Sequence, residues 1–382
     1  MTQIAHGTRT TFARTGFVAA FLATAGAVVM DQGARGDGGI RCWGGNWYGQ
    51  CYAPADLSAC SAISAGGFHS LAIQSDGSVR GWGFNTSGQC NAPPDLGGCL
   101  AISAGQYHSM GLRRDGTVRC WGRNWDEECN VPTDLGRCTA VAAGGFHSIA
   151  LQVNGAVRCW GAAAYSGTNF GQCETPTDLG ACLSIAGGRF HSIAIQRAGT
   201  VRCWGAGITS NAFDYGQCGV PTDLGTCSSI SAGGYHSMAI QSDGGVRCWG
   251  LNSYGQCYVP SDLGACSAVS GGQFHSVALR IDGSVRCWGV NGQGQCNEPL
   301  GRFTNISAGF AHCVSVEMQC PQCPASITGN CIVDGADLGM LLDRWGPCPA
   351  GTMGCLGDIN ADGYVDGADL GILLNTWGHC PN

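Results

Sequence analysis

The chain has 382 residues, a net charge of −7 and no lysine, so that all 19 basic residues are arginine. The absence of lysine excludes Schiff-base chemistry and a P-loop phosphate site. The arginines are spread along the chain and form no basic stripe of the kind that binds nucleic acid. Because only 12% of the residues are charged while 64 are glycine and 26 are cysteine, short strands joined by tight turns are favoured over long helices.

The N-terminus has the features of an export signal. Arg9 and Arg14 precede an apolar run over residues 17–30, which contains the small-residue segment Ala25-Gly26-Ala27. A run of this length is too short to span a bilayer, and it predicts a signal peptide over residues 1–30. No later segment is long enough to span a membrane, so we expect a secreted or cell-envelope protein of a bacterium.

A unit of about 40 residues recurs seven times within residues 31–318. One copy, residues 60–83, reads as a short strand, Gly-Gly, a strand that begins with His-Ser, an Asp-Gly turn, and a strand that ends in Trp-Gly. The histidine of each copy lies at His69, His108, His147, His191, His236, His275 and His312. Units of this size bury their faces only by stacking radially, which predicts a mainly β fold, a β-propeller.

The ends of the array predict that the propeller closes on itself. The last unit stops after Val316, where its Asp-Gly turn should follow, and the first recognisable segment starts at that turn, Asp37-Gly38. The two fragments add up to one blade. We therefore expect N- and C-terminal strands to pair in a shared blade, which gives seven blades and removes the exposed edges.

The repeated segments Ala-Gly-x-x-His-Ser, Asp-Gly-x-Val and Trp-Gly-x-Asn-x-x-Gly-Gln resemble the regulator-of-chromosome-condensation repeat family over residues 37–318. The resemblance implies a seven-bladed propeller. It leaves the function open, because that family includes a nuclear exchange factor, domains of ubiquitin ligases and a secreted inhibitor of β-lactamases.

Residues that recur in every blade are expected to be structural. We expect each repeat histidine to form a hydrogen bond within its own blade, and the Trp-Gly tryptophans to lie in the core. The aspartates of the Pro-x-Asp-Leu segments are interpreted as turn or cap residues. The cysteines recur as triplets, and the interval from second to third is constant at nine residues, which favours pairs such as Cys90–Cys99.

Three neighbouring copies depart from the pattern in the loop after Trp-Gly. Two of these loops are longer, and the preceding one carries Asp126, Glu127 and Glu128. Equivalent loops lie on one face of a propeller, and aromatic side chains are enriched in binding hot spots. The aromatics of these loops therefore predict a contact with a protein or a glycan: Trp125, Tyr165, Phe170, Phe213 and Tyr215.

After a linker at residues 319–325, a duplicated segment occupies residues 326–382. Its second copy spaces oxygen ligands as a calcium loop does, with a glycine at the sharp turn, and one helix is expected to follow. The predicted Ca²⁺ ligands are Asp358, Asn360, Asp362, Tyr364 through its carbonyl, Asp366 and Asp369.

The first copy is degenerate because Cys331 replaces the turn glycine. It is expected to form a weaker site from Thr328, Asn330, Ile332 and Asp337. A duplicated loop and helix with Asp at the last ligand position resembles the type I dockerin family. That resemblance implies a cohesin-like or other extracellular protein partner for the tail.

Three functions remain open. The first is a secreted non-catalytic binding or scaffold protein, which we favour. The second is a component or enzyme of polysaccharide degradation, a glycoside hydrolase, which needs two opposed carboxylates; the few acids outside the repeat are Asp126, Glu127, Glu128, Glu174, Asp214 and Glu298. The third is a secreted inhibitor of another enzyme.

Overall fold

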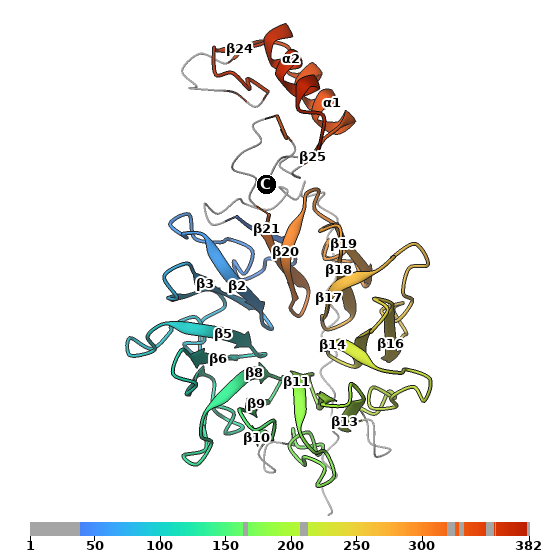
Figure 1. Ribbon diagram of the computed structural model, residues 1–382. Helices are drawn as coiled ribbons and strands as arrows, with labels where there is room; N and C mark the ends of the chain where they lie inside the picture. The colour runs from blue at the N-terminus through green and yellow to red at the C-terminus, as the bar shows by residue number, and fades with distance from the viewer. Residues whose placement is uncertain are drawn as a thin grey trace, which may run out of the picture. The chain divides into compact units, whose positions relative to one another are not determined.

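The computed structural model describes residues 39–162, 167–206, 213–318, 325–327, 332–348, 355 and 357–379. Residues 39–318 form seven three-stranded antiparallel sheets around a central axis, a mainly β propeller (Figure 1). The predicted signal peptide and residues 319–324 of the linker lie outside the described residues. Among the helices that the structure describes, none has the length and apolarity needed to cross a membrane.

Six blades are continuous in sequence and one is composite. The continuous blades are β2 (Cys60–Ala65), β3 (His69–Gln74), β4 (Val79–Gly83); β5 (Cys99–Ala104), β6 (His108–Arg113), β7 (Val118–Gly122); β8 (Cys138–Ala143), β9 (His147–Gln152), β10 (Val157–Gly161); β11 (Cys182–Gly187), β12 (His191–Gln196), β13 (Val201–Gly205); β14 (Cys227–Ala232), β15 (His236–Gln241), β16 (Val246–Gly250); and β17 (Cys266–Gly271), β18 (His275–Arg280), β19 (Val285–Gly289). The composite blade consists of β20 (Phe303–Ala308), β21 (His312–Glu317) and β1 (Ile40–Gly44).

The composite blade confirms the predicted closure. β1 pairs antiparallel with β21, with Ile40 opposite Val316 and Gly44 opposite His312. Residues near the two ends of the array therefore share one ladder, and the ring has no unpaired blade edge at this junction.

A ring of glycines around the axis joins the blades through their backbones. The N–H of Gly67 donates to the carbonyl of Gly105 at 3.0 Å, and that of Phe310 donates to the carbonyl of Gly66 at 3.3 Å, across the junction of the first and last blades. A Cβ atom on Gly66 would lie 2.5 Å from the carbonyl oxygen of Gly105, so only glycine permits this approach. The repeated glycine is thus required by blade-to-blade contact.

The register gives each blade two distinct ends. In the first continuous blade His69, the first residue of β3, lies opposite Gly83, the last residue of β4. The hairpins that contain Gly-Gly, such as the one between β2 and β3, and the loops after Trp-Gly therefore lie at one end of the blade, which we name the histidine end. The Asp-Gly turns lie at the other, the turn end, where Gly77 adopts a φ of +90°.

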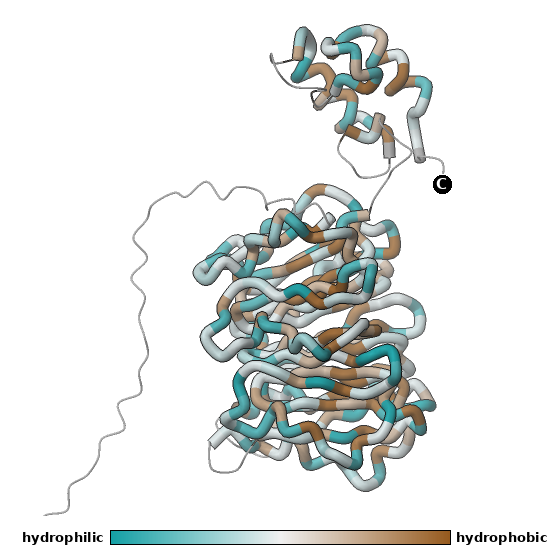
Figure 2. Tube along the Cα trace, turned by 90° about the vertical axis from the view of Figure 1, so that its left-hand side faces the viewer, coloured by the Kyte–Doolittle hydropathy of each residue, from teal (hydrophilic) through white to brown (hydrophobic). Residues whose placement is uncertain are grey.

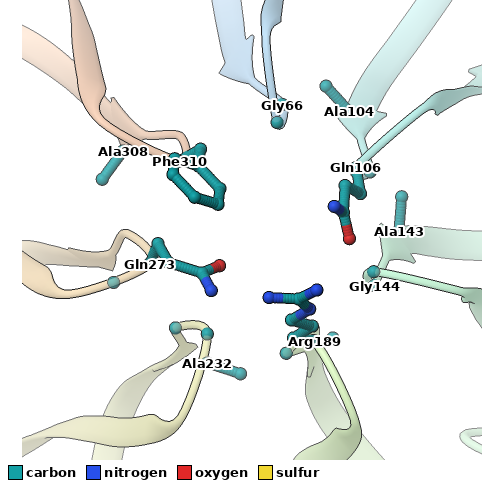
Figure 3. A pocket seen from close by; sticks show the side chains of 18 residues that line it. Gly66, Ala104, Gln106, Ala143, Gly144, Arg189, Ala232, Gln273, Ala308 and Phe310 are labelled. Carbon is teal, nitrogen blue, oxygen red and sulfur yellow. The ribbon is translucent and has the colours of Figure 1, made fainter. Parts of the chain in front are cut away.

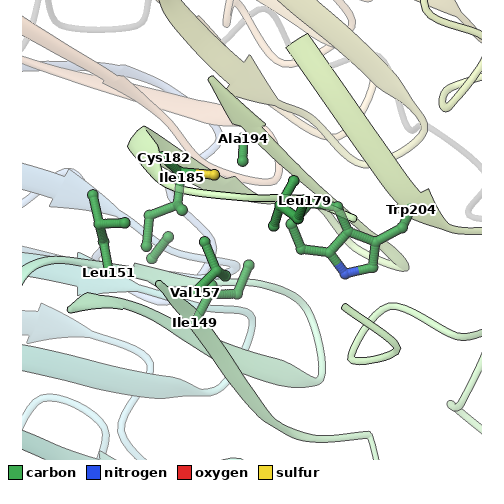
Figure 4. Packing of buried hydrophobic residues seen from close by; sticks show 9 residues of the cluster. Ile149, Leu151, Val157, Leu179, Cys182, Ile185, Ala194 and Trp204 are labelled. Carbon is green, nitrogen blue, oxygen red and sulfur yellow. The ribbon is translucent and has the colours of Figure 1, made fainter. Parts of the chain in front are cut away.

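Apolar cores lie between adjacent blades. Figure 2 shows apolar residues concentrated along the strands and hydrophilic residues along the loops. In the cluster of Figure 4, Ile149 and Leu151 of β9 face Ile185 of β11 and Trp204 of β13 in the next blade. The Trp-Gly tryptophans are buried, as predicted. Each blade buries its faces only against its neighbours, which is why the ring is the stable unit.

The disulfides contradict the predicted pairing. In four blades the first cysteine bonds the second, in the pairs Cys42–Cys51, Cys159–Cys173, Cys203–Cys218 and Cys248–Cys257, whereas the corresponding cysteines of two other blades are free. Cys90 and Cys99 are both free, because Gly81 stands where the first cysteine would be. The constant interval of nine residues belongs instead to the connector that leads into the next blade, whereas the disulfide closes the loop that varies in length.

The tail forms two strand–helix–strand copies whose short strands pair with those of the other copy. Asp334 and Asp366 cap the two helices, each in a capping box. β22 pairs with β25, and β23 with β24. The elements are β22 (Ile332–Val333), α1 (Gly335–Asp343), β23 (Gly346–Pro347), β24 (Tyr364–Val365), α2 (Gly367–Asn375) and β25 (Gly378–His379).

Only part of the predicted apolar helix face is buried in the tail. Leu341 of α1 and Leu373 of α2 lie in the core with Val333 and Val365. The leucine after each of them and the tryptophan that follows the helix are about half exposed, because each helix end turns away from the small core. These exposed residues form two equivalent pairs, Leu342 with Trp345 and Leu374 with Trp377.

Candidate functional site

Aromatic side chains form a belt at the histidine end of the propeller. In six blades the residue before the repeat histidine is aromatic, and we name these residues the aromatic belt: Phe68, Tyr107, Phe146, Phe190, Tyr235 and Phe274. Their rings follow one another around the axis. Centroids lie 5.3 Å apart for Phe146 and Phe190, and 6.1 Å apart for Phe190 and Tyr235. Such spacing is typical of favourable ring packing, so the belt is rigid.

A second set of aromatics lies outside the belt and is accessible to solvent. These outer aromatics come from the loops after Trp-Gly and are 43–76% exposed: Trp47, Tyr48, Trp125, Tyr215 and Tyr254. Four of them pack against the belt, and Trp125 instead lies against the Arg123 guanidinium, which is 5.4 Å from the Trp125 ring centroid. The ring of Tyr48 lies 5.5 Å from that of Phe68, and the ring of Tyr254 lies 5.1 Å from that of Phe274. The histidine end therefore presents a preorganised aromatic surface.

The predicted partner-binding residues divide into two groups in the structure. Trp125 and Tyr215 are exposed outer aromatics. Phe170 and Phe213 instead pack against the buried Phe190, with centroids 5.0 and 4.8 Å away, so they support the surface. Tyr165 lies outside the described residues.

Sequence reasoning missed the belt and three of the outer aromatics. The belt obeys the repeat, and an aromatic residue that recurs in each blade has the pattern of a structural residue. Trp47 and Tyr48 lie in a loop of ordinary length, and so does Tyr254, whereas the predicted contact rested on loops that depart from the pattern. The frequency of aromatics at equivalent loop positions is the signal that reveals them.

Arg123 joins the belt to a cluster of acids that occurs in one blade only. Its guanidinium lies 5.2 Å from the ring centroid of Tyr107 and 5.0 Å from that of Phe146, which bridges the gap between these two belt residues. Arg123 also forms ion pairs with Asp126 and, at 2.8 Å, with Glu128. All three side chains are at least nine-tenths buried.

The acids weighed for catalysis are engaged in structural contacts. Asp126 and Glu128 share Arg123, and the Thr168 hydroxyl donates to Asp126 at 2.6 Å. Glu298 accepts the backbone N–H of Cys287 at 2.8 Å. These three of the six acids weighed for catalysis hold loops in place.

The repeat histidines bind across blades, which corrects the prediction of bonds within each blade. His312 Nε2 lies 3.1 Å from Ser70 Oγ, and the Ser70 hydroxyl donates to the carbonyl of Gln50 at 2.9 Å. The Trp82 indole donates to the same carbonyl at 2.8 Å. The pairs His69–Ser109, His108–Ser148, His147–Ser192, His191–Ser237 and His236–Ser276 repeat this contact, and His275 contacts Cys313 instead.

The bonding pattern determines the protonation of these histidines. Because the serine proton goes to a carbonyl, the imidazole must donate from Nε2, and its Nδ1 is an unprotonated acceptor. No described residue forms a hydrogen bond with Nδ1 in any of the seven. Burial disfavours the charged form and lowers the pKa of His69 from 6.5 to about 3. The ring is therefore held together by neutral histidines.

In the loop before α2, two of the predicted calcium ligands accept hydrogen bonds from backbone N–H groups. The Asp358 carboxylate accepts the N–H groups of Asp362 and Gly363, both at 3.0 Å, which closes the sharp turn. Asp369 is fully buried and accepts the N–H groups of Ile359 at 2.6 Å and Asn360 at 3.1 Å. Backbone donors thus hold the first and last predicted ligands, and the donor set consists of the hard oxygens that Ca²⁺ prefers.

Other parts of the predicted calcium sites carry less support. Within the ranges that the structure describes, no three His, Cys, Asp or Glu side chains converge as a metal cluster. Asp366 caps α2 by accepting the N–H of Ala368 at 2.7 Å. In the first copy Thr328 and Asn330 lie outside the described residues, and Asp337 is buried in the α1 capping box.

A comparison with protein-family models identifies the repeat. The model described as the regulator of chromosome condensation (RCC1) repeat matches residues 60–89, 100–125, 138–172, 227–256 and 266–295. No curated protein matches this chain.

Solved structures show the same architecture. Prp20p of Saccharomyces cerevisiae is 18% identical, with a TM-score of 0.61 over 73% of this chain and 92% of that one. Human WBSCR16 is 20% identical, with a TM-score of 0.57 over 69% and 88%. The ectodomain of the Physcomitrella patens receptor kinase CR4 is 27% identical, with a TM-score of 0.53 over 65% and 67%. Together with the matched repeats, these likenesses show that the chain folds as a propeller of the RCC1 type.

Proposed function

We propose that this chain is a secreted, non-catalytic binding protein whose propeller receives a protein partner on the aromatic surface of its histidine end, while its tail binds calcium and tethers it to an extracellular assembly. The observation that carries the proposal is the set of five exposed outer aromatics, four of which pack against the aromatic belt while Trp125 packs against Arg123. Rigid aromatics give a large contact area at low entropic cost, which is the character of a binding hot spot.

The comparisons and the cysteines support this proposal. Prp20p binds Gsp1p and histones, so a protein with a propeller of this architecture serves as a binding partner of other proteins. The four disulfides found in the propeller and the Cys348–Cys355 disulfide in the tail are typical of an oxidising compartment. Export through the N-terminal signal would bring the chain there.

The tail carries the tethering part of the proposal. Asp358, Asn360, Asp362 and Asp369 would hold Ca²⁺ through side-chain oxygens and Tyr364 through its carbonyl, and the ion would stiffen the loop before α2. The exposed pairs Leu342–Trp345 and Leu374–Trp377 supply apolar area for docking on a cohesin-like or other extracellular protein.

Removing outer aromatics is expected to abolish partner capture. With the full chain as bait against secreted proteins of its source, Trp47→Ala/Trp125→Ala should weaken binding of the captured protein about thirtyfold or more, because each change removes a hot-spot side chain. Ile281→Ala is the matched control, since Ile281 is 74% exposed but lies at the turn end. Equal binding by all three proteins would refute the aromatic surface. Capture of a polysaccharide in place of a protein would show that the surface binds glycans, and release of sugar products would show hydrolysis.

Calcium titration tests the tail separately. Calorimetry on the full chain should show one strong calcium site, and Asp369→Asn should weaken it about tenfold or more because a buried carboxylate ligand is lost. Asp343→Asn, at the exposed end of α1, should leave the affinity unchanged. Unaltered calcium binding by Asp369→Asn would contradict the assignment of this loop.

A further inference from the structure

A pocket opens on the propeller axis, inside the aromatic belt. It is an open pocket with a volume of about 100 Å³, and it is lined by the ends of the first strands and by the hairpins that follow them (Figure 3). Most of the wall is glycine or alanine, so that the few larger side chains determine its chemistry. In Figure 3 four of these side chains point toward the axis: Gln106, Arg189, Gln273 and Phe310.

These four side chains occupy one repeat position, two residues before the histidine. The same position is glycine in the other three blades, Gly67, Gly145 and Gly234. The hydrogen bonds between blades at this position need only the backbone N–H, which glycine also provides. The N–H of Gly67 makes the same blade-to-blade bond as the N–H groups of Gln273 and Phe310. The fold therefore does not require polar side chains at this position.

Arg189 brings a positive charge onto the axis without a carboxylate beside it. One guanidinium nitrogen donates to the Tyr235 hydroxyl at 3.0 Å, and the group lies 5.1 Å from the ring centroid of Phe190. Its Nε is buried and has no hydrogen-bond acceptor among the described residues. By contrast, Arg123 is neutralised by Asp126 and Glu128. The guanidinium is thus held in place by aromatic rings while part of its donor capacity is unused.

The remaining lining strengthens the preference for an anion. The described residues around the pocket include no Asp or Glu. Gln106 and Gln273 contribute amide groups, whose N–H atoms can donate to an oxyanion, and Phe310 supplies an apolar wall. One guanidinium flanked by two amides matches a single planar negative charge, and arginine binds carboxylates through paired N–H bonds.

We infer that the axial pocket is a binding site for one carboxylate group, held by Arg189 with Gln106 and Gln273. This inference goes beyond the proposed function, since the carboxylate can belong to a free small organic acid or to an acidic side chain that a docked protein inserts along the axis. The carboxylate site is also distinct from the outer aromatics, because Arg189, Gln106 and Gln273 are not among them.

The test follows the Arg189 Nε–Hε signal of the ¹⁵N-labelled full chain by NMR, identified by its absence in Arg189→Gln. Three probes are titrated at constant ionic strength: acetate, the blocked peptide acetyl-Gly-Asp-Gly-amide, and acetamide as the neutral control. The Arg189 signal should shift saturably with acetate, with the peptide or with both, and acetamide should have no effect. The signal of Arg123, which is already paired, should not move.

The variants determine whether the pocket residues carry the binding. Arg189→Gln, followed through the side-chain amide signals of Gln106 and Gln273, should weaken binding of the effective probe about tenfold or more, as expected for a charge-assisted hydrogen bond in a partly buried site. Gln106→Ala/Gln273→Ala should weaken it less while preserving the Arg189 signal, which shows that the ring is intact. Saturation by acetate alone would identify the source as a free acid, and saturation by the peptide alone would identify it as an acidic side chain. A shift that grows linearly for all arginines, or an equal response to acetamide, would overturn the inference.

Discussion

Acidification from pH 6.5 toward pH 4 should unfold the propeller with an exceptionally steep dependence on proton concentration. The cause is the ring of seven buried histidines, each of which donates from Nε2 to the next blade. A proton on Nδ1 would create a buried charge that no described residue accepts.

The sign follows from the pKa of each histidine in the two states. Burial lowers the pKa from 6.5 to about 3 in the folded ring, and to about 4 for His236. Between these pH values the unfolded chain binds protons that the folded chain cannot bind. The stabilisation is therefore complete above pH 6.5 and is lost as the pH falls toward 3. Each histidine contributes about 1.4 kcal/mol per pH unit, so the slope for all seven approaches ~10 kcal/mol per pH unit.

Denaturant unfolding followed by tryptophan fluorescence at a series of pH values measures this slope. His147→Gln keeps an amide donor near Ser192 and should reduce the slope by about 1.4 kcal/mol per pH unit, whatever its effect on stability at pH 7.5. A slope of one proton or fewer between pH 6 and pH 4 in the parent chain would show that the histidines titrate in the folded ring, contrary to the structure.

Replacing Arg123 by phenylalanine should destabilise the propeller severely. Arg123 pairs with Asp126 and Glu128, and both acids are almost fully buried. Without the guanidinium, two carboxylates remain in an apolar site, and loss of one partner of a buried ion pair costs about 3–5 kcal/mol. Denaturant unfolding at pH 7.5 should show a loss of this size for Arg123→Phe.

The sequence of the preceding blade suggests substitutions that should restore the stability lost in Arg123→Phe. The equivalent positions of the preceding blade hold Phe84, Ser87 and Gln89, a set without charge. Arg123→Phe/Asp126→Ser/Glu128→Gln copies this set and should recover most of the lost stability, since the buried charges leave together. If the single and triple variants were equally unstable, Arg123 would act through its packing on the belt and not through its ion pairs.

The blades and their closure could be predicted because they depend on patterns that are local in sequence. The Asp-Gly turns, the alternating strands and the half-blade at each end of the array specify β1 and β21 as partners without any knowledge of distant contacts. A helix was likewise expected after the predicted calcium loop, and the structure adds that Asp334 caps α1 and Asp366 caps α2.

Contacts between blades could not be predicted in this way. A histidine that recurs in every blade has the same sequence context whether it bonds its own blade or the next, so only the structure places Ser109 beside His69. Constant spacing likewise indicated the wrong cysteine pairs, because the invariant interval belongs to the connector between blades, whereas the disulfides close loops of 9 to 15 residues. The aromatic surface was predicted in part, through Trp125 and Tyr215. The aromatic belt was not predicted, because its residues recur in nearly every blade and were therefore interpreted as structural.

Site-specific photo-crosslinking tests most directly whether a partner docks on the histidine end. A photoreactive phenylalanine analogue is placed at Tyr48 or Tyr254 of the outer aromatics, and at Val153 or Ile281 of the turn end, all more than half exposed. Irradiation with the secreted proteins of the source should give the same covalent partner from Tyr48 and Tyr254 and none from the other two positions. Adducts from Val153 and Ile281 alone, or equally from all four positions, would contradict the proposed binding surface.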